Sequence, residues 1–322
     1  MNDLPTTLLE AVRYFTDLNV CNEYMKRIKW PNGTIVCPNC EAKGKRIGEI
    51  KTRNMLRCKD CRKQFSYKVG TIFEDSPLGL DKWLVAVWCI ANMKNGISSH
   101  ELARALGVQQ KSAWFMLHRI RKAMEVGGFD KFDGPSEADT TYVGGKAANM
   151  HKDVKERRIT GRGGVDKTAV HGVLQRGDDD TASQVVATVI DNEESHTLLA
   201  DVRGKVRYGA QVYTDAAHAY GDLGLTHFHK QVDHARAYAI GEIHTNGLEN
   251  FWSLLKRALG GTYVAVAPYH LRRYVAEQVF RFNNRRTSDL GRFALVMARC
   301  VGRRLTYRML CGIGDAGFMG IK

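Results

Sequence analysis

The sequence predicts a chain of several folded units: a small β-rich unit around paired cysteines, a helical unit, and a larger unit that mixes strands and helices. Three observations support this prediction. Two C-x2-C pairs lie seventeen residues apart, residues 80–125 repeat apolar side chains at helical spacing, and short β-branched runs alternate with helical stretches in the second half. At 322 residues the chain has room for two or three units of ordinary size.

The charge of the chain is strongly positive and unevenly spread. Forty-eight Lys and Arg stand against thirty-four Asp and Glu, a formal net charge of +14. Residues 1–125 contain 21 basic and 12 acidic side chains, and residues 251–322 contain 13 and 3. Because cations placed near phosphates release condensed counterions, such a surplus favours a polyanion. We therefore expect DNA to be held at more than one place.

Membrane insertion and export are not expected. The longest apolar stretch, Trp83–Met93, is interrupted and shorter than the ~18 residues that a spanning helix needs. The N-terminal residues lack the basic and then apolar layout of a signal peptide. We expect a cytoplasmic protein with no membrane partner.

The paired cysteines predict a structural zinc site. A redox C-x-x-C motif would explain one pair but not two at this separation, and a chain without an export signal favours metal over disulfides. Four thiolates complete a tetrahedral shell and leave no open position for catalysis. We therefore predict a zinc ribbon over residues 31–70 that binds one Zn²⁺ through Cys37, Cys40, Cys58 and Cys61.

Helical patterns surround the ribbon. Within residues 1–30, Leu8, Leu9, Val12 and Phe15 predict a short amphipathic helix. Within residues 80–125, Ser98 and Glu101 form a capping box that starts one helix, and a Gly-containing turn leads to a second.

This pair of helices has the layout of a helix-turn-helix DNA-binding region. The second helix carries Lys111, Arg119 and Arg121, which we expect to contact DNA. A helical hairpin that touches no DNA would show the same pattern.

Residues 135–290 predict one mixed α/β unit. Its expected strands are rich in β-branched residues, and its expected helices follow them. The strands are 137–143, 169–175, 184–190 and 210–214, and the helices are 248–259 and 270–282. Residues 291–322 are expected to form a basic C-terminal tail.

Three acids are the candidate catalytic residues of this unit. Asp139 lies on the first expected strand, Asp215 ends the fourth, and Glu249 lies near the start of the next helix, which Asn246 is expected to cap. Carboxylates at strand ends point into the crevice where ligands bind in α/β sheets. Phosphodiester transfer uses two metal ions held by such groups, and hard Mg²⁺ or Mn²⁺ suits them. Lys256, about two turns after Glu249, shares its helix face.

The phrases around these acids carry a resemblance to a known family. They are Asp139-Thr140-Thr141-Tyr142-Val143-Gly144-Gly145-Lys146, Tyr213-Thr214-Asp215, His244-Thr245-Asn246-Gly247-Leu248-Glu249-Asn250-Phe251-Trp252 with Lys256-Arg257, and Arg281-Phe282-Asn283-Asn284-Arg285-Arg286. From about residue 31 to 286, the chain resembles insertion-sequence transposases of the DDE superfamily that carry a zinc ribbon, of the ISXO2-like type.

The resemblance implies an RNase H-like catalytic domain. Asp139, Asp215 and Glu249 would hold two ions of Mg²⁺ or Mn²⁺, with Asn246 as the alternative third ligand. Lys256 would contact DNA near the cleavage site, and Arg272, Arg281 and Arg285 would hold its backbone. Relatives commonly have Glu after each of the first two acids, where this chain has Thr140 and Ala216.

The implied function is that of a transposase, a polynucleotidyl transferase acting at the bacterial nucleoid. It would bind terminal inverted repeats in double-stranded DNA, cleave there, and join the end to target DNA as a homodimer or larger assembly. Two alternatives remain open: a catalytically inactive zinc-ribbon DNA-binding regulator, and a nuclease of the same fold that does not transfer strands.

Overall fold

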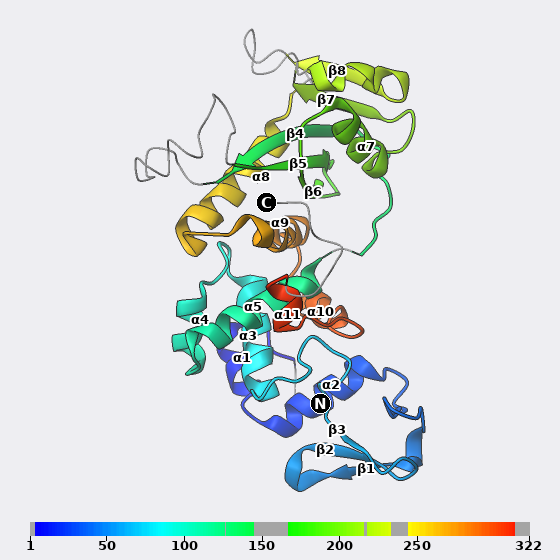
Figure 1. Ribbon diagram of the computed structural model, residues 1–322, viewed down its shortest axis with the longest axis vertical. Helices are drawn as coiled ribbons and strands as arrows, with labels where there is room; N and C mark the ends of the chain where they lie inside the picture. The colour runs from blue at the N-terminus through cyan, green and yellow to red at the C-terminus, as the bar shows by residue number, and fades with distance from the viewer. Residues whose placement is uncertain (1–3, 126, 145–166, 216–217, 233–243, 313–322) are drawn as a thin grey trace. The chain divides into compact units, whose positions relative to one another are not determined.

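The computed structural model of the protein describes residues 4–125, 127–144, 167–215, 218–232 and 244–312 (Figure 1). The chain forms two compact units, one from residues 1–125 with 287–322 and the other from residues 126–286. Within the described ranges no helix has both the length and the hydropathy needed to cross a bilayer.

The first unit is helical apart from its cysteine-bearing segment. Its helices are α1 (Leu8–Tyr14), α2 (Leu18–Lys29), α3 (Leu80–Asn92), α4 (Ser99–Leu106), α5 (Gln110–Met124), α10 (Asp289–Ala298) and α11 (Tyr307–Leu310). An aromatic cluster forms part of its core, because the ring of Phe293 lies 5.4 Å from Phe15, 5.7 Å from Tyr24 and 5.3 Å from Trp88. These rings bring α1, α2, α3 and α10 together.

The prediction of a C-terminal tail over residues 291–322 is therefore wrong for its described part. Phe293 is 0% exposed, and Val296 and Met297 on the next turn of α10 are buried with it. Ser288 caps the helix by accepting from the N–H of Gly291. The apolar side chains recur at helical spacing after a good cap, so the segment folds into the core of the first unit. Residues 313–322 lie outside the described residues.

The predicted pair of helices in residues 80–125 is present. Ser98 and Glu101 form a capping box at the start of α4, and Gly107 ends that helix in the left-handed region at φ 61°. Only a residue without Cβ adopts that conformation freely, so the turn into α5 depends on this glycine. Lys111, in the first turn of α5, is exposed.

Two of the residues on α5 that were predicted to contact DNA are buried, so the prediction is wrong for them. Arg119 is 4% exposed and Arg121 is 1% exposed. Arg119 donates to the backbone oxygen of Glu74, and its guanidinium lies 5.4 Å from the ring centroid of Trp83. Burial lowers the pKa of Arg119 to about 10. Both guanidinium groups are therefore enclosed within the unit, and apolar periodicity alone does not show which cations turn inward.

The cysteine-bearing segment forms a small antiparallel sheet. Its strands are β1 (Ile47–Ile50), β2 (Met55–Cys58) and β3 (Gln64–Phe65), in the order β1-β2-β3. A short 3-10 turn at Lys51–Arg53 and Asn54, at φ 51°, connect the first two strands. Asn tolerates this left-handed conformation better than most residues do.

The second unit is built on a five-stranded sheet. The strands are β4 (Ser136–Val143), β5 (Thr168–Gln175), β6 (Gln184–Ile190), β7 (Gln211–Asp215) and β8 (Phe228–Val232), in the order β6-β5-β4-β7-β8. β5 is antiparallel to β4 and β6, whereas β7 is parallel to β4 and β8. The four strands that the sequence predicts agree with β4 to β7 within one residue at each end.

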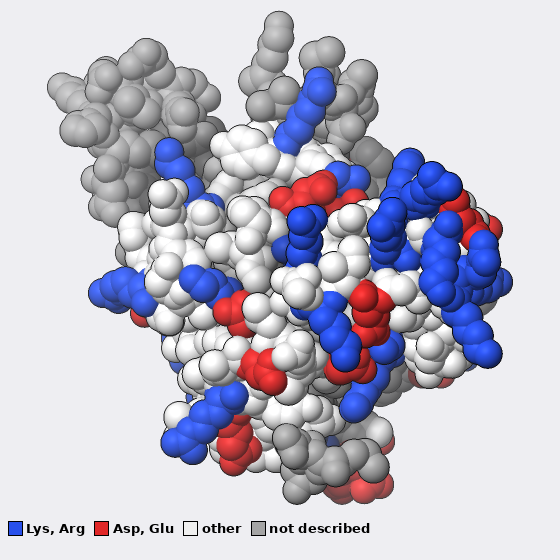
Figure 2. Space-filling view, turned by 90° about the horizontal axis from the view of Figure 1, so that it is seen from below, with Lys and Arg blue, Asp and Glu red and all other residues white. Residues whose placement is uncertain are grey.

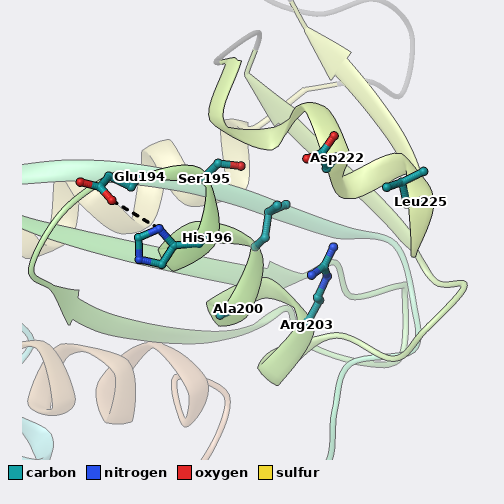
Figure 3. Close-up of a pocket in the computed structure, with 8 residues that line it drawn as sticks. Glu194, Ser195, His196, Ala200, Arg203, Asp222 and Leu225 are labelled. Carbon is teal, nitrogen blue, oxygen red and sulfur yellow. Dashed lines mark ion pairs between the residues drawn. The ribbon is translucent and has the colours of Figure 1, made fainter.

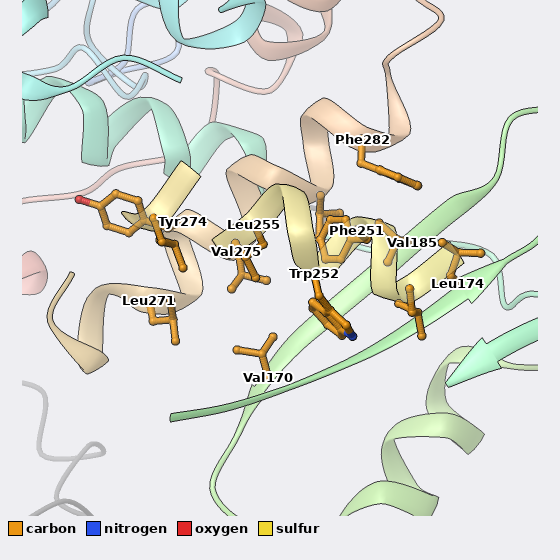
Figure 4. Packing of buried hydrophobic residues seen from close by; sticks show 13 residues of the cluster. Val170, Leu174, Val185, Phe251, Trp252, Leu255, Leu271, Tyr274, Val275 and Phe282 are labelled. Atoms are coloured by element: carbon orange, nitrogen blue, oxygen red, sulfur yellow. The ribbon is translucent and has the colours of Figure 1, made fainter. Parts of the chain in front are cut away.

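Helices cover both faces of this sheet. One face packs against α8 (Asn246–Arg257), which continues as a π-helical turn (Ala258–Tyr263), and against α9 (Pro268–Asn283). Figure 4 shows the buried cluster there, which includes Phe251 and Trp252 of α8 and Val170 and Leu174 of β5. The other face packs against α7 (Ser195–Lys205) and a 3-10 segment (His218–Leu225).

A glycine in β5 allows α8 to lie close to the sheet. A Cβ atom on Gly172 would lie 2.7 Å from the ring of Trp252, closer than real Cβ contacts. We expect Gly172→Ala to lower the free energy of unfolding by about 1–3 kcal/mol, because a packed ring must move. Urea titration followed by circular dichroism measures this.

Gly204→Ala is the matched control in the same unit, since a Cβ atom added there would meet nothing within 4 Å. This helical position should be unchanged or stabilised by about 0.5–1 kcal/mol. Equal stability of Gly172→Ala and the wild type would show that Trp252 has room to retreat.

Candidate functional site

The four predicted zinc ligands come together at one end of the small sheet. The Sγ atoms of Cys37 and Cys61 lie 3.7 Å apart, and those of Cys40 and Cys58 lie 3.5 Å apart. A zinc ion about 2.3 Å from each sulfur would separate neighbouring sulfurs by about 3.8 Å. All four sulfurs lie within 4.8 Å of one another, so the cluster fits a structural zinc.

The surface around this cluster is basic. Lys and Arg side chains are exposed on the face drawn in Figure 2, with acidic side chains among them. The exposed basic residues of the ribbon are Lys43, Lys45, Arg46, Lys51, Arg53, Arg57, Lys59, Arg62 and Lys63. Arg46 is paired with Asp60. The remaining positive charge suits a polyanion such as DNA.

Asp139 and Asp215 lie on adjacent parallel strands. Ala138 of β4 is aligned with Thr214 of β7, and the two acids are the next residue on each strand. Side chains alternate between faces along a strand, so both carboxylates point to the face that α8 covers. Trp252 of α8 donates its indole N–H to Oδ2 of Asp139 at 2.8 Å, which fixes the carboxylate against the helix.

Glu249 lies in the first turn of α8, three residues before Trp252. Its carboxylate is exposed, whereas Asp139 is largely covered. Burial, opposed by the hydrogen bond from Trp252 and aided by the negative charges of Asp215 and Glu249, raises the pKa of Asp139 to about 6. Asp215 and Glu249 therefore both act electrostatically on Asp139, although 110 residues separate Asp139 from Glu249.

This donor set suits a hard divalent cation. Three carboxylates that repel one another would be neutralised by Mg²⁺ or Mn²⁺, whose preferred ligands are oxygens. Among the described residues, only the four cysteines place three or more ligand atoms within 4.8 Å of one another, so the acids are spaced more widely. Such spacing is compatible with two ions about 3.5–4 Å apart, between which the ligands are shared.

Asn246 and Lys256 are both exposed on α8. The expectation that Asn246 caps this helix is wrong. The N-cap position is Thr245, whose side chain makes no capping bond, and the N–H of Leu248 is instead bound by Glu137 of β4 at 2.9 Å. Because Glu137 of β4, and not Asn246, binds an N–H group at the start of α8, the exposed Asn246 side chain is not used as a cap. It lies three residues before Glu249.

Comparison with known proteins identifies the family. Residues 131–283 match the family described as ISXO2-like transposase domain, and residues 18–64 match the transposase zinc-ribbon domain. An uncharacterized transposase-like protein of Haemophilus influenzae is 34% identical over 102 residues, which are 31% of this chain and 82% of that protein. This chain belongs to the ISXO2-like transposase family.

A second relative of this transposase is an uncharacterized protein in transposable element ISH50 of Halobacterium salinarum. It is 28% identical over 271 residues, which cover 80% of the chain and 90% of the relative. The zinc-ribbon match begins at residue 18 and so includes α2, ahead of the expected start at residue 31. Asp139, Asp215 and Glu249 all lie inside the longer match.

The arginines on and after α9 that were predicted to contact DNA are of two kinds in this transposase, exposed and buried. Arg272 and Arg285 are exposed. Arg281 is 7% exposed and forms an ion pair with Glu277 of the same helix, which raises its pKa even though burial opposes the change. Since Glu277 already neutralises this guanidinium, the prediction that Arg281 holds DNA is corrected.

The departure at Thr140 lies away from the acids. Thr140 is aligned with His171 of β5, whose ring nitrogens contact Asp201 of α7 and, at 3.1 Å, Tyr220. Thr140 and His171 therefore lie on the sheet face that packs against α7, opposite the face that packs against α8. A Thr in place of the usual Glu therefore leaves the carboxylate face unaltered. Ala216 lies outside the described residues.

Several residues of the site escaped the sequence analysis. Trp252 stands in a phrase that the resemblance contains, but nothing local shows its bond to Asp139. Glu137 precedes Asp139 by two residues on the same strand face, and this spacing is a signal that could have found it. Arg176 follows β5 directly and donates to Glu137 at 2.8 Å.

A pocket in the second unit is separate from the acids. Glu194, Ser195, His196, Leu199, Ala200, Arg203, Asp222 and Leu225 line it (Figure 3). They belong to α7, the residue before it and the 3-10 segment, which cover the opposite face of the sheet. None of the predicted site residues lines this pocket.

Proposed function

We propose that this transposase hydrolyses a phosphodiester bond at each end of an insertion sequence and joins the freed 3′-hydroxyl to target DNA. One observation carries the proposal. Asp139 and Asp215 point from adjacent parallel strands toward the helix that bears Glu249, and the charges of both other acids raise the pKa of Asp139. Carboxylates that repel one another near the ends of adjacent strands are characteristic of a catalytic centre that binds cations.

The sheet supports an RNase H-like assignment for this catalytic unit. Counted within the unit, the strands lie in the order 3-2-1-4-5, with the first three antiparallel and the last two parallel to the first. The resemblance places the first acid on strand one, the second after strand four and the third on a later helix. Asp139 lies on the first strand, Asp215 ends the fourth and Glu249 lies in the first turn of α8, which supports this assignment.

The cofactor would be Mg²⁺ or Mn²⁺ held by the three acids, and when bound it would activate the attacking oxygen and stabilise the leaving one. The protein contributes orientation. Trp252 donates to Oδ2 of Asp139, which orients the carboxylate. Asp139 must be ionised to serve as a ligand, so its raised pKa means that protons would compete with the cation as the pH falls toward and below about 6.

Cationic side chains of both units would hold the DNA. We assign this role to the exposed basic side chains of the ribbon, to Lys111 at the start of α5, and to Lys256, Arg272 and Arg285. Arg285 also donates to the backbone oxygen of Ser183, which orients its guanidinium. Joining two ends implies a homodimer or larger assembly acting on chromosomal DNA at the nucleoid.

The test is a cleavage and joining assay with Mg²⁺ or Mn²⁺ on DNA that carries the repeats flanking the gene. Asp139→Asn, Asp215→Asn and Glu249→Gln should each reduce joining on the order of a thousandfold, because each removes a charged ligand. Asp133→Asn is the matched control, an exposed acid of the same unit paired only loosely with Arg207 at 3.5 Å.

The same assay separates the alternatives. Loss of joining in Asn246→Ala, with activity retained in Glu249→Gln, would make Asn246 the third ligand. Cleavage without joining would favour a nuclease. Tight binding of the repeats without cleavage by the wild type would favour an inactive regulator and contradict the catalytic proposal.

A further inference from the structure

A second set of side chains lies directly behind the three acids. Glu137 precedes Asp139 by two residues on β4, Tyr213 precedes Asp215 by two on β7, and Leu248 precedes Glu249 by one on α8. Residues two apart on a strand share a face. Glu137 and Tyr213 therefore share the sheet face of Asp139 and Asp215, and Leu248 lies next to Glu249 at the start of α8.

Glu137 joins this set through both carboxylate oxygens. Oε1 accepts from Nε of Arg176 at 2.8 Å, and Oε2 accepts from the backbone N–H of Leu248 at 2.9 Å. The carboxylate is 1% exposed, so these bonds replace its hydration. A negative charge at a helix N-terminus also interacts favourably with the exposed N–H groups there.

Arg176 extends the same set of contacts to β7 and to the segment before α8. Its guanidinium lies 4.3 Å from the ring centroid of Tyr213, and its Nη2 donates to the backbone oxygen of His244 at 2.7 Å. His244 also lies within 3.4 Å of Glu137. One ion pair thus contacts β4, β7 and the start of α8.

The close contact between Glu137 and the start of α8 requires a glycine at position 247. A Cβ atom on Gly247 would lie 2.8 Å from Oε2 of Glu137, so only glycine lets the first turn of α8 approach the carboxylate this closely. Trp252 and Gly172 fix the same helix one turn further along. The position of Glu249 is set between these two contacts.

We infer that Glu137 and Arg176 are positioning residues that hold Glu249 at its distance from Asp139 and Asp215. The inference deepens the proposed function and rests on it for the role of Glu249. Buried ion pairs contribute little to stability compared with apolar residues of the same size, so their value here is geometric. Residues that orient metal ligands typically change metal affinity by about 10–100-fold when they are replaced.

The experiment uses the zinc-loaded full-length protein labelled with ¹⁵N-tryptophan. The Trp252 indole signal, assigned by its loss in Trp252→Phe, reports the contact of α8 with Asp139 without requiring activity. Mn²⁺ affinity is measured in parallel by electron paramagnetic resonance. Glu137→Gln should shift the Trp252 signal and weaken Mn²⁺ binding about tenfold or more, whereas Asp133→Asn should do neither.

Two further variants separate positioning from folding. Glu137→Gln with Glu249→Gln should bind Mn²⁺ no more weakly than Glu249→Gln alone, because Glu137 acts through Glu249. Glu137→Gln with Arg176→Met leaves no unpaired buried charge and should recover stability, but not Mn²⁺ affinity. Additive losses in the first double variant, or wild-type affinity in the second, would overturn the inference.

Failure of the proposed function gives a different result. If Glu249→Gln leaves Mn²⁺ affinity unchanged, the ligand assignment is wrong, and the Trp252 signal alone then decides the positioning of α8. A shifted signal in Glu137→Gln would support the positioning role for α8. An unmoved signal would overturn it.

Discussion

Cys58→Ser is expected to unfold the zinc ribbon. The described part of residues 31–70 buries only four apolar side chains besides its cysteines: Ile35, Leu56, Phe65 and Tyr67. A core this small does not offset the conformational entropy of the segment. Structural zinc sites contribute on the order of 10 kcal/mol to folding, so loss of one thiolate removes most of the driving force.

The measurement combines zinc content with circular dichroism and binding of the terminal repeats. We expect loss of zinc, loss of the ribbon signal and at least a tenfold weaker DNA affinity, because the nine exposed cations would no longer be held together. A strong chelator should produce the same state in the wild type. Cys311→Ser, outside the cluster, serves as the control. A zinc-free protein with an unchanged spectrum would contradict the prediction.

Asp139→Asn is expected to stabilise the protein at pH 8 while abolishing its binding of divalent cations. Burial and the neighbouring acids raise the pKa of Asp139 to about 6, against about 3.9 for an unfolded chain. The folded state therefore binds more protons between pH 4 and 6, and the free energy of unfolding falls as pH rises through this window. Two pKa units correspond to about 3 kcal/mol at most.

The asparagine removes that cost and still offers an oxygen to Trp252. Chemical unfolding of the wild type and the variant should differ by about 1–3 kcal/mol at pH 8 and converge near pH 4. Mg²⁺ should stabilise the wild type but not the variant, because only the wild type is expected to bind it. Equal stability at pH 8 would show that Asp139 carries no electrostatic strain. Asp133→Asn should change nothing at either pH.

Local patterns were enough to find most elements of the second unit. β4 to β7 are rich in β-branched residues and agree with the prediction within one residue at each end. β8 was not predicted because apolar and polar residues alternate only weakly over Phe228–Val232. α7 was not predicted because it has few apolar residues on its buried face. α10 had a clear helical pattern, but its basic surroundings suggested a tail.

The candidate site could be predicted only in part. The order and spacing of the acids, together with the resemblance, indicated Asp139, Asp215 and Glu249, and the structure brings their strands and helix together. The supporting contacts connect residues more than one hundred positions apart, such as Trp252 with Asp139 and Leu248 with Glu137. No local pattern encodes such pairs. Burial of Arg119, Arg121 and Arg281 was likewise invisible in the sequence.

The core of the first unit has a consequence for the order of synthesis. Phe293 completes an aromatic cluster whose other members, Phe15, Tyr24 and Trp88, leave the ribosome between 205 and 278 residues earlier. The second unit, residues 126–286, is fully translated before that ring emerges. The nascent chain therefore carries a complete second unit together with an unfinished first unit, and a premature stop codon between residues 287 and 292 removes Phe293 from the core of the first unit while leaving Asp139, Asp215 and Glu249 in the chain.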